Sequence, residues 1–170
     1  MKKILTAVLA AMLVLSLMAP ALAEVQIGQV LYAAHGTKCF SLMTVAVDGD
    51  VIVDAYIDEF QIMDSTLTTP VPNAEAMFGD KLGENQQLGS KRVNNEYYSE
   101  LLASHAQATN TLAASYDAIQ EFVTGKTIAE LEALLAGTEK AAMVDTVAGS
   151  TLTDTYGYVA GLVEAAKSVK

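Results

Sequence analysis

The chain has 170 residues, of which 20 are acidic and 10 basic, so its formal net charge is −10. This length suits one domain, and the acidity argues against binding to nucleic acid or anionic membranes, because phosphate contacts need clustered Lys and Arg. A single cysteine excludes an internal disulfide framework, a CxxC redox pair and a Cys-rich metal site.

The N-terminal segment, residues 1–23, has the pattern of a secretory signal peptide. Two lysines precede an apolar run over residues 4–18, and the segment ends in Ala-Leu-Ala, which signal peptidases cut. The run is short for a membrane-spanning helix, and Cys39 lies too far from the cut for a lipid anchor. We expect cleavage after Ala23, which removes two lysines and no acid and takes the net charge from −10 to −12. The mature domain, residues 24–170, is then expected outside the cytoplasm, in the periplasm or the medium, with no direct membrane anchor.

The first part of the mature chain predicts antiparallel strands. Residues 25–34 are rich in strand-forming side chains, and residues 40–47 place apolar side chains at alternate positions. Asp48, Gly49 and Asp50 separate this run from a third apolar run over residues 51–57, as in a hairpin. We therefore expect a sheet of about three strands.

Two polar stretches that follow are predicted to face solvent. The carboxylates near the end of the third run, among them Asp58 and Glu59, fit a solvated strand face better than a catalytic acid/base pair. Residues 64–95 carry prolines, glycines and little periodicity, which predicts a long loop or flap. Solvent exposure is the default for Ser90 and Lys91 in such a loop.

The apolar pattern then becomes helical. Spacings of i, i+3, i+4 and i+7 occur over residues 98–105 and 112–123. Thr127 and Glu130 have the spacing of a capping box that opens a third helix, and a last helix has its apolar stripe over residues 159–166. Strands followed by helices predict an α+β fold, with a small antiparallel sheet and a closing C-terminal helix.

Residues 145–153, just before the last helix, are the strongest candidate for chemistry. They read Asp-Thr-Val-Ala-Gly-Ser-Thr-Leu-Thr, and Gly149 permits a tight turn with close backbone approach. The hydroxyls of Ser150, Thr151 and Thr153 precede a helix, whose N-terminal N–H groups and dipole favour an anion such as phosphate. A plain Ser/Thr cap of that helix is the alternative, and the spacing leaves both interpretations open.

The same segment resembles the flavinylation motif of FMN-binding domains, Asp-x-x-[Ser/Thr]-Gly-Ala-[Thr/Ser], which lies near the C-terminus of exported electron-carrier proteins. In that family a flavin transferase esterifies the phosphate of FMN to the hydroxyl of the last motif residue. Matched position by position, Asp145 is the leading acid, Gly149 the glycine and Thr151 the modified threonine, and Thr153 also follows family usage.

Two motif positions depart from the family pattern. Ala148 stands where Ser or Thr is usual, and Ser150 stands where Ala is usual. Both residues are small, so the turn is expected to survive, but Ser150 adds a second hydroxyl beside Thr151. A weaker resemblance to small secreted members of the family extends over most of residues 26–166.

The resemblance implies an exported flavoprotein that carries FMN on Thr151 and shuttles electrons between redox partners or to an extracellular acceptor. Asp145, Gly149, Ser150, Thr151 and Thr153 are then the cofactor-binding residues. The expected partners are a flavin transferase and redox proteins of the membrane or the exterior. We expect a carrier rather than an enzyme with its own substrate. The alternative is a secreted module of the same fold that binds FMN noncovalently, or has lost flavin and acts as a binding or structural protein.

A flavin ring also needs an apolar and aromatic seat with a polar group near its nitrogens. Tyr156, Tyr158 and Met43 are candidates for that seat, with a place in the hydrophobic core as the alternative. Ser90 and Lys91 are candidates for covering the phosphate or the ring edge.

Overall fold

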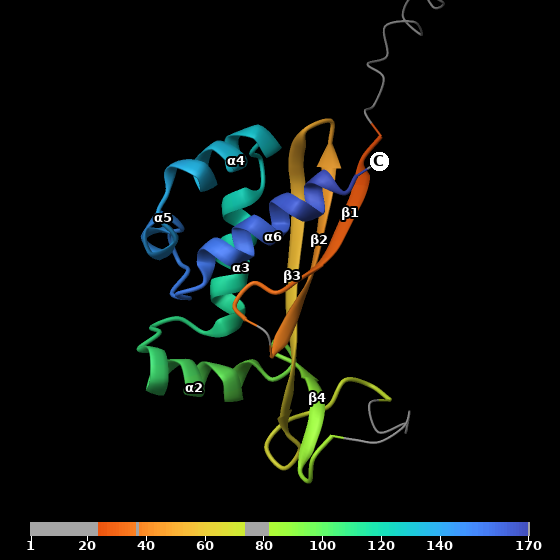
Figure 1. Cartoon of the computed structure of the whole chain (residues 1–170), viewed down its shortest axis with the longest axis vertical. Coiled ribbons are helices and arrows are strands. Elements are labelled where there is room, and N and C mark those ends of the chain that lie inside the picture. The colour runs from red at the N-terminus through yellow and green to blue at the C-terminus, as the bar shows by residue number, and fades with distance from the viewer. Residues whose placement is uncertain (1–23, 37, 74–81, 170) are drawn as a thin grey trace, which may run out of the picture.

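The computed structural model describes residues 24–36, 38–73 and 82–169, so the predicted signal peptide lies outside the described residues. A four-stranded antiparallel sheet in the order β1-β2-β3-β4 is followed by helices (Figure 1), which confirms the predicted α+β fold. Among the described residues, none of the helices has both the length and the apolar character needed to cross a membrane.

The sheet has one more strand than the sequence predicts. Its strands are β1 (Gln26–Tyr32), β2 (Cys39–Asp48), β3 (Val51–Asp64) and β4 (Gln86–Ser90). Gly49, at a φ of 65°, lies in the predicted turn between β2 and β3. The prediction of a loop throughout residues 64–95 is wrong, because β4 pairs with the end of β3. The five residues of β4 have no alternating apolar pattern, so only their pairing with β3 defines them as a strand.

The helices follow the sheet along the chain, and one of them begins at the predicted capping box. They are α2 (Asn95–Ala106), α3 (Leu112–Val123), α4 (Ile128–Gly137), the 3-10 turn η1 (Lys140–Ala142), α5 (Met143–Thr146) and α6 (Thr155–Lys167). The Thr127 hydroxyl accepts from the Glu130 N–H at 3.2 Å, and a Glu130 carboxylate oxygen accepts from the Thr127 N–H at 2.8 Å. The predicted capping box at the start of α4 is therefore confirmed.

Helices α3 and α6 cover one face of the sheet (Figure 1), and the core lies between them and the inward residues of β2 and β3. The predicted apolar stripes of both helices are buried. Helix α6 approaches β1 closely, since a Cβ on Gly28 would lie 2.0 Å from the Ala165 carbonyl oxygen. At the other end of α6, a Cβ on Gly157 would lie 2.0 Å from the Ala34 carbonyl oxygen. This packing brings the segment after β1 beside the start of α6.

Candidate functional site

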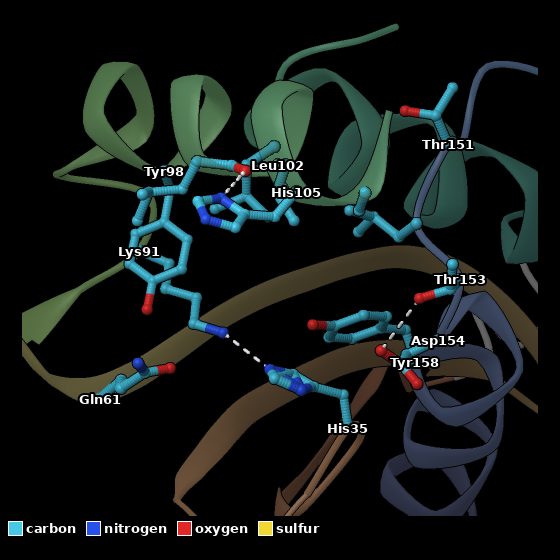
Figure 2. Close-up of a pocket in the computed structure, with 14 residues that line it drawn as sticks. His35, Gln61, Lys91, Tyr98, Leu102, His105, Thr151, Thr153, Asp154 and Tyr158 are labelled. Carbon is cyan, nitrogen blue, oxygen red and sulfur yellow. Dashed lines mark hydrogen bonds between the residues drawn. The ribbon is translucent and has the colours of Figure 1, made fainter. Parts of the chain in front are cut away.

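A pocket of about 390 Å³ lies between α2, the segment before α6 and the sheet (Figure 2). Its apolar wall is formed by Leu101, Leu102, Leu112 and Leu152. Its polar lining includes His35, Gln61, Lys91, Tyr98 and Tyr158, with Thr151, Thr153 and Asp154 on the side opposite Lys91. An apolar cavity of roughly 300–1,000 Å³ with a few convergent polar groups is typical of small-ligand sites.

The structure brings some of the predicted site residues to this pocket and leaves others away from it. Thr151 and Thr153 line the pocket. Gly149 forms the turn before them with a φ of 91°, a backbone conformation that favours glycine. Ser150 is buried beneath the turn, and Asp145 is exposed on α5 and does not line the pocket.

The turn is anchored to the segment that precedes α3. The Asn110 side-chain amide donates to the Gly149 carbonyl at 2.8 Å, and the Asn110 backbone N–H donates to Thr151 Oγ1 at 3.3 Å. Thr151 Oγ1 also lies 3.5 Å from Ser115 Oγ. These contacts place the partly exposed Thr151 at the edge of the pocket.

The neighbouring hydroxyl of Ser150 has a different environment. Ser150 is 6 % exposed, and its Oγ lies 2.7 Å from Thr155 Oγ1. Thr155 Oγ1 in turn donates to the Leu152 carbonyl at 2.6 Å, so the Ser150 hydroxyl donates to Thr155. A buried, hydrogen-bonded hydroxyl is poorly placed to react with an external reagent, whereas Thr151 and Thr153 are accessible.

The Ser/Thr residues of the motif do not cap α6. Asp154 occupies the N-cap position, and its side chain makes no capping hydrogen bond. Thr151 lies four residues before the first helical residue, so the predicted Ser/Thr cap is wrong. The expectation of an anion at this helix N-terminus is also weakened, because a carboxylate already lies there. The ammonium group that lines the pocket belongs to Lys91, on the side opposite Thr151.

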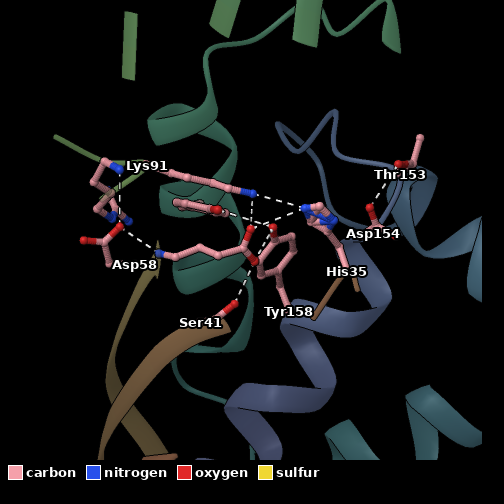
Figure 3. Close-up of polar contacts among 10 residues, drawn as sticks. His35, Ser41, Asp58, Lys91, Thr153, Asp154 and Tyr158 are labelled. Atoms are coloured by element: carbon pink, nitrogen blue, oxygen red, sulfur yellow. Dashed lines mark hydrogen bonds and ion pairs between the residues drawn. The ribbon is translucent and has the colours of Figure 1, made fainter. Parts of the chain in front are cut away.

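A buried polar cluster lies beneath the pocket (Figure 3). Glu59 is 0 % exposed, and its Oε2 accepts from Ser41 Oγ at 2.8 Å and from the Tyr158 hydroxyl at 3.0 Å. Its Oε1 accepts from Lys91 Nζ. Lys91, itself 3 % exposed, also has its Nζ 3.1 Å from His35 Nε2. The prediction that Glu59 and Lys91 face solvent is therefore wrong.

Lys91 is held in place by the strand pair that the sequence did not predict. Its backbone N–H donates to the Glu59 carbonyl at 2.8 Å, directly after β4 ends. The Ser90 hydroxyl donates to Asp58 Oδ2 at 2.6 Å, and both residues are buried. The predicted exposure of Asp58 and Ser90 is thus also wrong, because they fasten β4 to β3.

The cluster is an ion pair with neutral tyrosines around it. Burial raises the pKa of Glu59, but the Lys91 ammonium, with smaller contributions from His35 and Ser41, outweighs burial and lowers the pKa overall. Burial, followed by Tyr116 and Glu59, raises the pKa of Tyr158 well above its ordinary value. At neutral pH, Glu59 is therefore a carboxylate that receives hydrogen bonds from a charged lysine and a neutral tyrosine.

Three possible metal ligands also meet beside this cluster. Among the described residues, ligand atoms of His35, Cys39 and Glu59 all lie within 4.8 Å of one another. The Lys91 ammonium, however, already contacts both His35 and Glu59. Burial, followed by the charge of Glu59, raises the pKa of the Cys39 thiol to about 11, and a thiol must lose its proton to bind a metal. This donor set disfavours a metal ion.

A scan against protein-family models, a search of curated proteins and a search of solved structures found no match to this chain. The class of protein is therefore defined by the fold and the pocket alone. It is an α+β domain with a pocket that has a partly exposed threonine, Thr151, on one side and a buried ion pair on the other.

Proposed function

We propose that the protein is an exported flavoprotein that carries FMN as a phosphoester on Thr151 and shuttles electrons between redox partners or to an extracellular acceptor. A flavin transferase is the modifying partner in this proposal, and the protein acts as a carrier without a substrate of its own. The observation that carries the proposal is the contrast between adjacent hydroxyls. Thr151 lines the pocket, whereas Ser150 is buried and donates to Thr155.

The residues of the pocket fit a flavin. The leucines of α2 and Leu152 offer an apolar seat, and Tyr98 and Tyr158 add aromatic side chains. Gln61, Lys91 and His35 offer polar groups to the edge of a ring. Of the other candidate seat residues, Met43 lies in the core and Tyr156 lines a neighbouring cavity. FMN, when bound, supplies reversible two-electron chemistry at its ring, and the protein supplies its attachment, orientation and electrostatics.

The test is the intact mass of the protein after co-expression with a flavin transferase. The proposal predicts an increase equal to one FMN less one water. Thr151→Ala abolishes the increase, and Ser150→Ala, the matched control, retains it because the Ser150 hydroxyl is buried. Thr153→Ala also retains it. An unshifted mass, under conditions that label a standard motif, contradicts the covalent attachment. An adduct that persists in Thr151→Ala assigns the ester to another hydroxyl.

Visible absorbance separates the proposal from its alternatives. A covalently attached flavin stays with the protein after denaturation and filtration, so the protein fraction keeps its visible absorbance. A noncovalent flavin passes into the filtrate, and a binding or structural module that has lost flavin is colourless from the start.

A further inference from the structure

The pocket faces only one end of the buried ion pair. Lys91 lines the pocket, whereas Glu59 is 0 % exposed and is not part of the lining. The stem of Lys91 runs beside Tyr98, with Nζ 4.8 Å from the centre of the ring (Figure 2). Although the pair is neutral as a whole, an occupant of the pocket therefore meets its ammonium end first.

The other ionisable side chains that line the pocket are in closer contact with water than Lys91 is. Asp154 and His105 are exposed, and the His35 side chain is 34 % exposed. Charges in contact with water are weakened by its high dielectric constant and by salt, but a buried charge acts at much closer to full strength. At its end of the pocket, the Lys91 ammonium is thus closer to an occupant than the buried Glu59 carboxylate with which it pairs.

The positions of Thr151 and Lys91 determine which part of a flavin would meet this charge. Figure 2 shows the two side chains on opposite sides of the pocket. The phosphate and the ring are at opposite ends of FMN. A phosphate anchored at Thr151 leaves the ring as the part available to approach Lys91.

We infer that Lys91, positioned by Glu59, makes the pocket bind the reduced flavin ring more tightly than the oxidised ring. This inference rests on the proposed FMN function. An oxidised ring that takes up two electrons and one proton gains one negative charge, while the phosphate is unchanged. Lys91 is already fixed in place by its contact with Glu59, so it can pair with that charge without a costly rearrangement.

The test uses the unmodified protein, produced without a flavin transferase, and free FMN. FMN is titrated without oxygen, once oxidised and once chemically reduced, and the two dissociation constants are compared. Because the phosphate is the same in both titrations, their ratio isolates the ring. The expected result for the wild-type protein is a reduced form bound about tenfold more tightly, which corresponds to about 1.4 kcal/mol.

The variants separate the charge of Lys91 from its structural role. Lys91→Met alone leaves the buried Glu59 unpaired, so it is combined with Glu59→Gln, which removes both charges. The double variant is expected to bind the two forms equally well. Lys91→Arg keeps the charge and is expected to keep the preference. Lys167→Met is the control for loss of one positive charge, because Lys167 is exposed and pairs with Glu164 and Glu132.

Each outcome decides the inference. Binding of both forms without a preference by the wild-type protein overturns the inference and leaves the proposed flavin function in place. The inference is also overturned, and the proposed function left in place, if the double variant keeps the wild-type ratio of the two dissociation constants. Circular dichroism checks that the double variant is folded. If neither form binds the wild-type protein, the inference is overturned, whereas the covalent attachment to Thr151 is decided separately by the mass increase. An absent covalent adduct with a clear preference for reduced FMN overturns only the attachment to Thr151.

Discussion

A fully buried carboxylate is stable only when its hydrogen-bond acceptors and its charge are satisfied. Glu59 meets both conditions through Ser41, Tyr158 and Lys91. The three donors come from β2, from α6 and from the residue after β4. The cluster therefore links distant parts of the chain at a single side chain.

Removing the charge of Lys91 alone is expected to destabilise the fold. Lys91→Met leaves the Glu59 carboxylate buried without its counterion, a change that typically costs about 3–5 kcal/mol. Lys91→Met combined with Glu59→Gln is expected to recover much of this loss, because no buried charge remains. Urea unfolding of the wild type, the single variants and the double variant gives the complete cycle. Equal losses in Lys91→Met and in exposed Lys167→Met would contradict the importance of the buried pair.

Cys39 is expected to be a protected thiol in the native protein. It is 8 % exposed, and its pKa of about 11, raised by burial and then by Glu59, keeps it protonated near pH 8. Thiolates, not thiols, react with alkylating agents. Mass spectrometry after iodoacetamide treatment at pH 8 should show slow labelling of native protein and fast labelling in denaturant. Rapid native labelling would show that the thiol is accessible and ionised.

Among the elements, the close contact of α6 with β1 depends on glycines that leave room for backbone. The Ala165 carbonyl oxygen occupies the place that a Cβ on Gly28 would need. On the same helix, a Cβ on Gly161 would lie 2.3 Å from the sulfur of Met43, which is a flexible side chain. Glycine is therefore required more strictly at position 28 than at position 161, because a Cβ on Gly28 would meet main-chain atoms.

Gly28→Ala is expected to lower the free energy of unfolding by about 1–3 kcal/mol, the usual effect of overpacking. Gly137→Ala is the matched control, since Gly137 ends α4 and a Cβ there meets no atom within 4 Å. Alanine at Gly137 is expected to stabilise the protein by roughly 0.5–1 kcal/mol, through the lower entropy of the unfolded chain. Both changes are measured by urea unfolding. Equal effects at the two glycines would argue against the close α6–β1 contact.

The elements that the sequence predicts are those defined by neighbours in the chain. The β2–β3 turn and the capping box at Thr127 follow from residues a few positions apart, which interact wherever the segment lies. Strand β4 could not be predicted, because it becomes a strand only through its pairing with β3. The ion pair could not be predicted for the same reason, since Glu59 and Lys91 are 32 positions apart in the sequence.

The same distinction applies to the candidate site: its consecutive residues could be predicted, and the residues that only packing brings together could not. The motif around Thr151 could be found because its residues are consecutive, and the structure places Thr151 at a pocket. The opposite wall comes from α2, and Lys91 comes from the end of β4. The partners of those residues are fixed by tertiary packing, which carries no local pattern. Asp145 shows the converse, since a match to a motif did not bring it to the pocket.

For the whole molecule, buried ionisable groups determine how stability depends on pH. The pKa of Glu59 is lowered overall, since the Lys91 ammonium outweighs the opposing effect of burial. Its contribution is therefore present above the ordinary value of 4.5 and is lost as the pH falls through the lower native value. Acid is thus expected to weaken the fold by protonating this carboxylate.

Alkaline pH is expected to destabilise the protein because several buried groups have raised pKa values, whereas the pKa of Glu59 is lowered. Burial is the main cause that raises the pKa values of Cys39, Tyr98, Tyr116 and Tyr158 in the folded state. As the pH rises past the ordinary values of 9.0 for the thiol and 10.0 for the phenols, the unfolded chain loses these protons while the folded chain keeps them. Their stabilisation is complete below pH 9 and decreases above it. Urea unfolding between pH 7 and pH 11 should therefore give a falling free energy of unfolding.

Repulsion among the excess acidic residues provides a second explanation for such a loss, and salt separates the two. The net charge of −10 acts largely between exposed groups, whose repulsion is screened at high ionic strength. The desolvation of buried phenols and of the Cys39 thiol is little affected by salt. The alkaline loss of stability should therefore persist in 0.5 M salt, in the same ~pH 9–11 interval that buried Cys and Tyr groups predict. Tyr158→Phe, which removes one buried phenol, should make the decline shallower even as it lowers stability at pH 7 by removing a donor to Glu59. If salt abolishes the decline, surface repulsion rather than the buried groups is its cause.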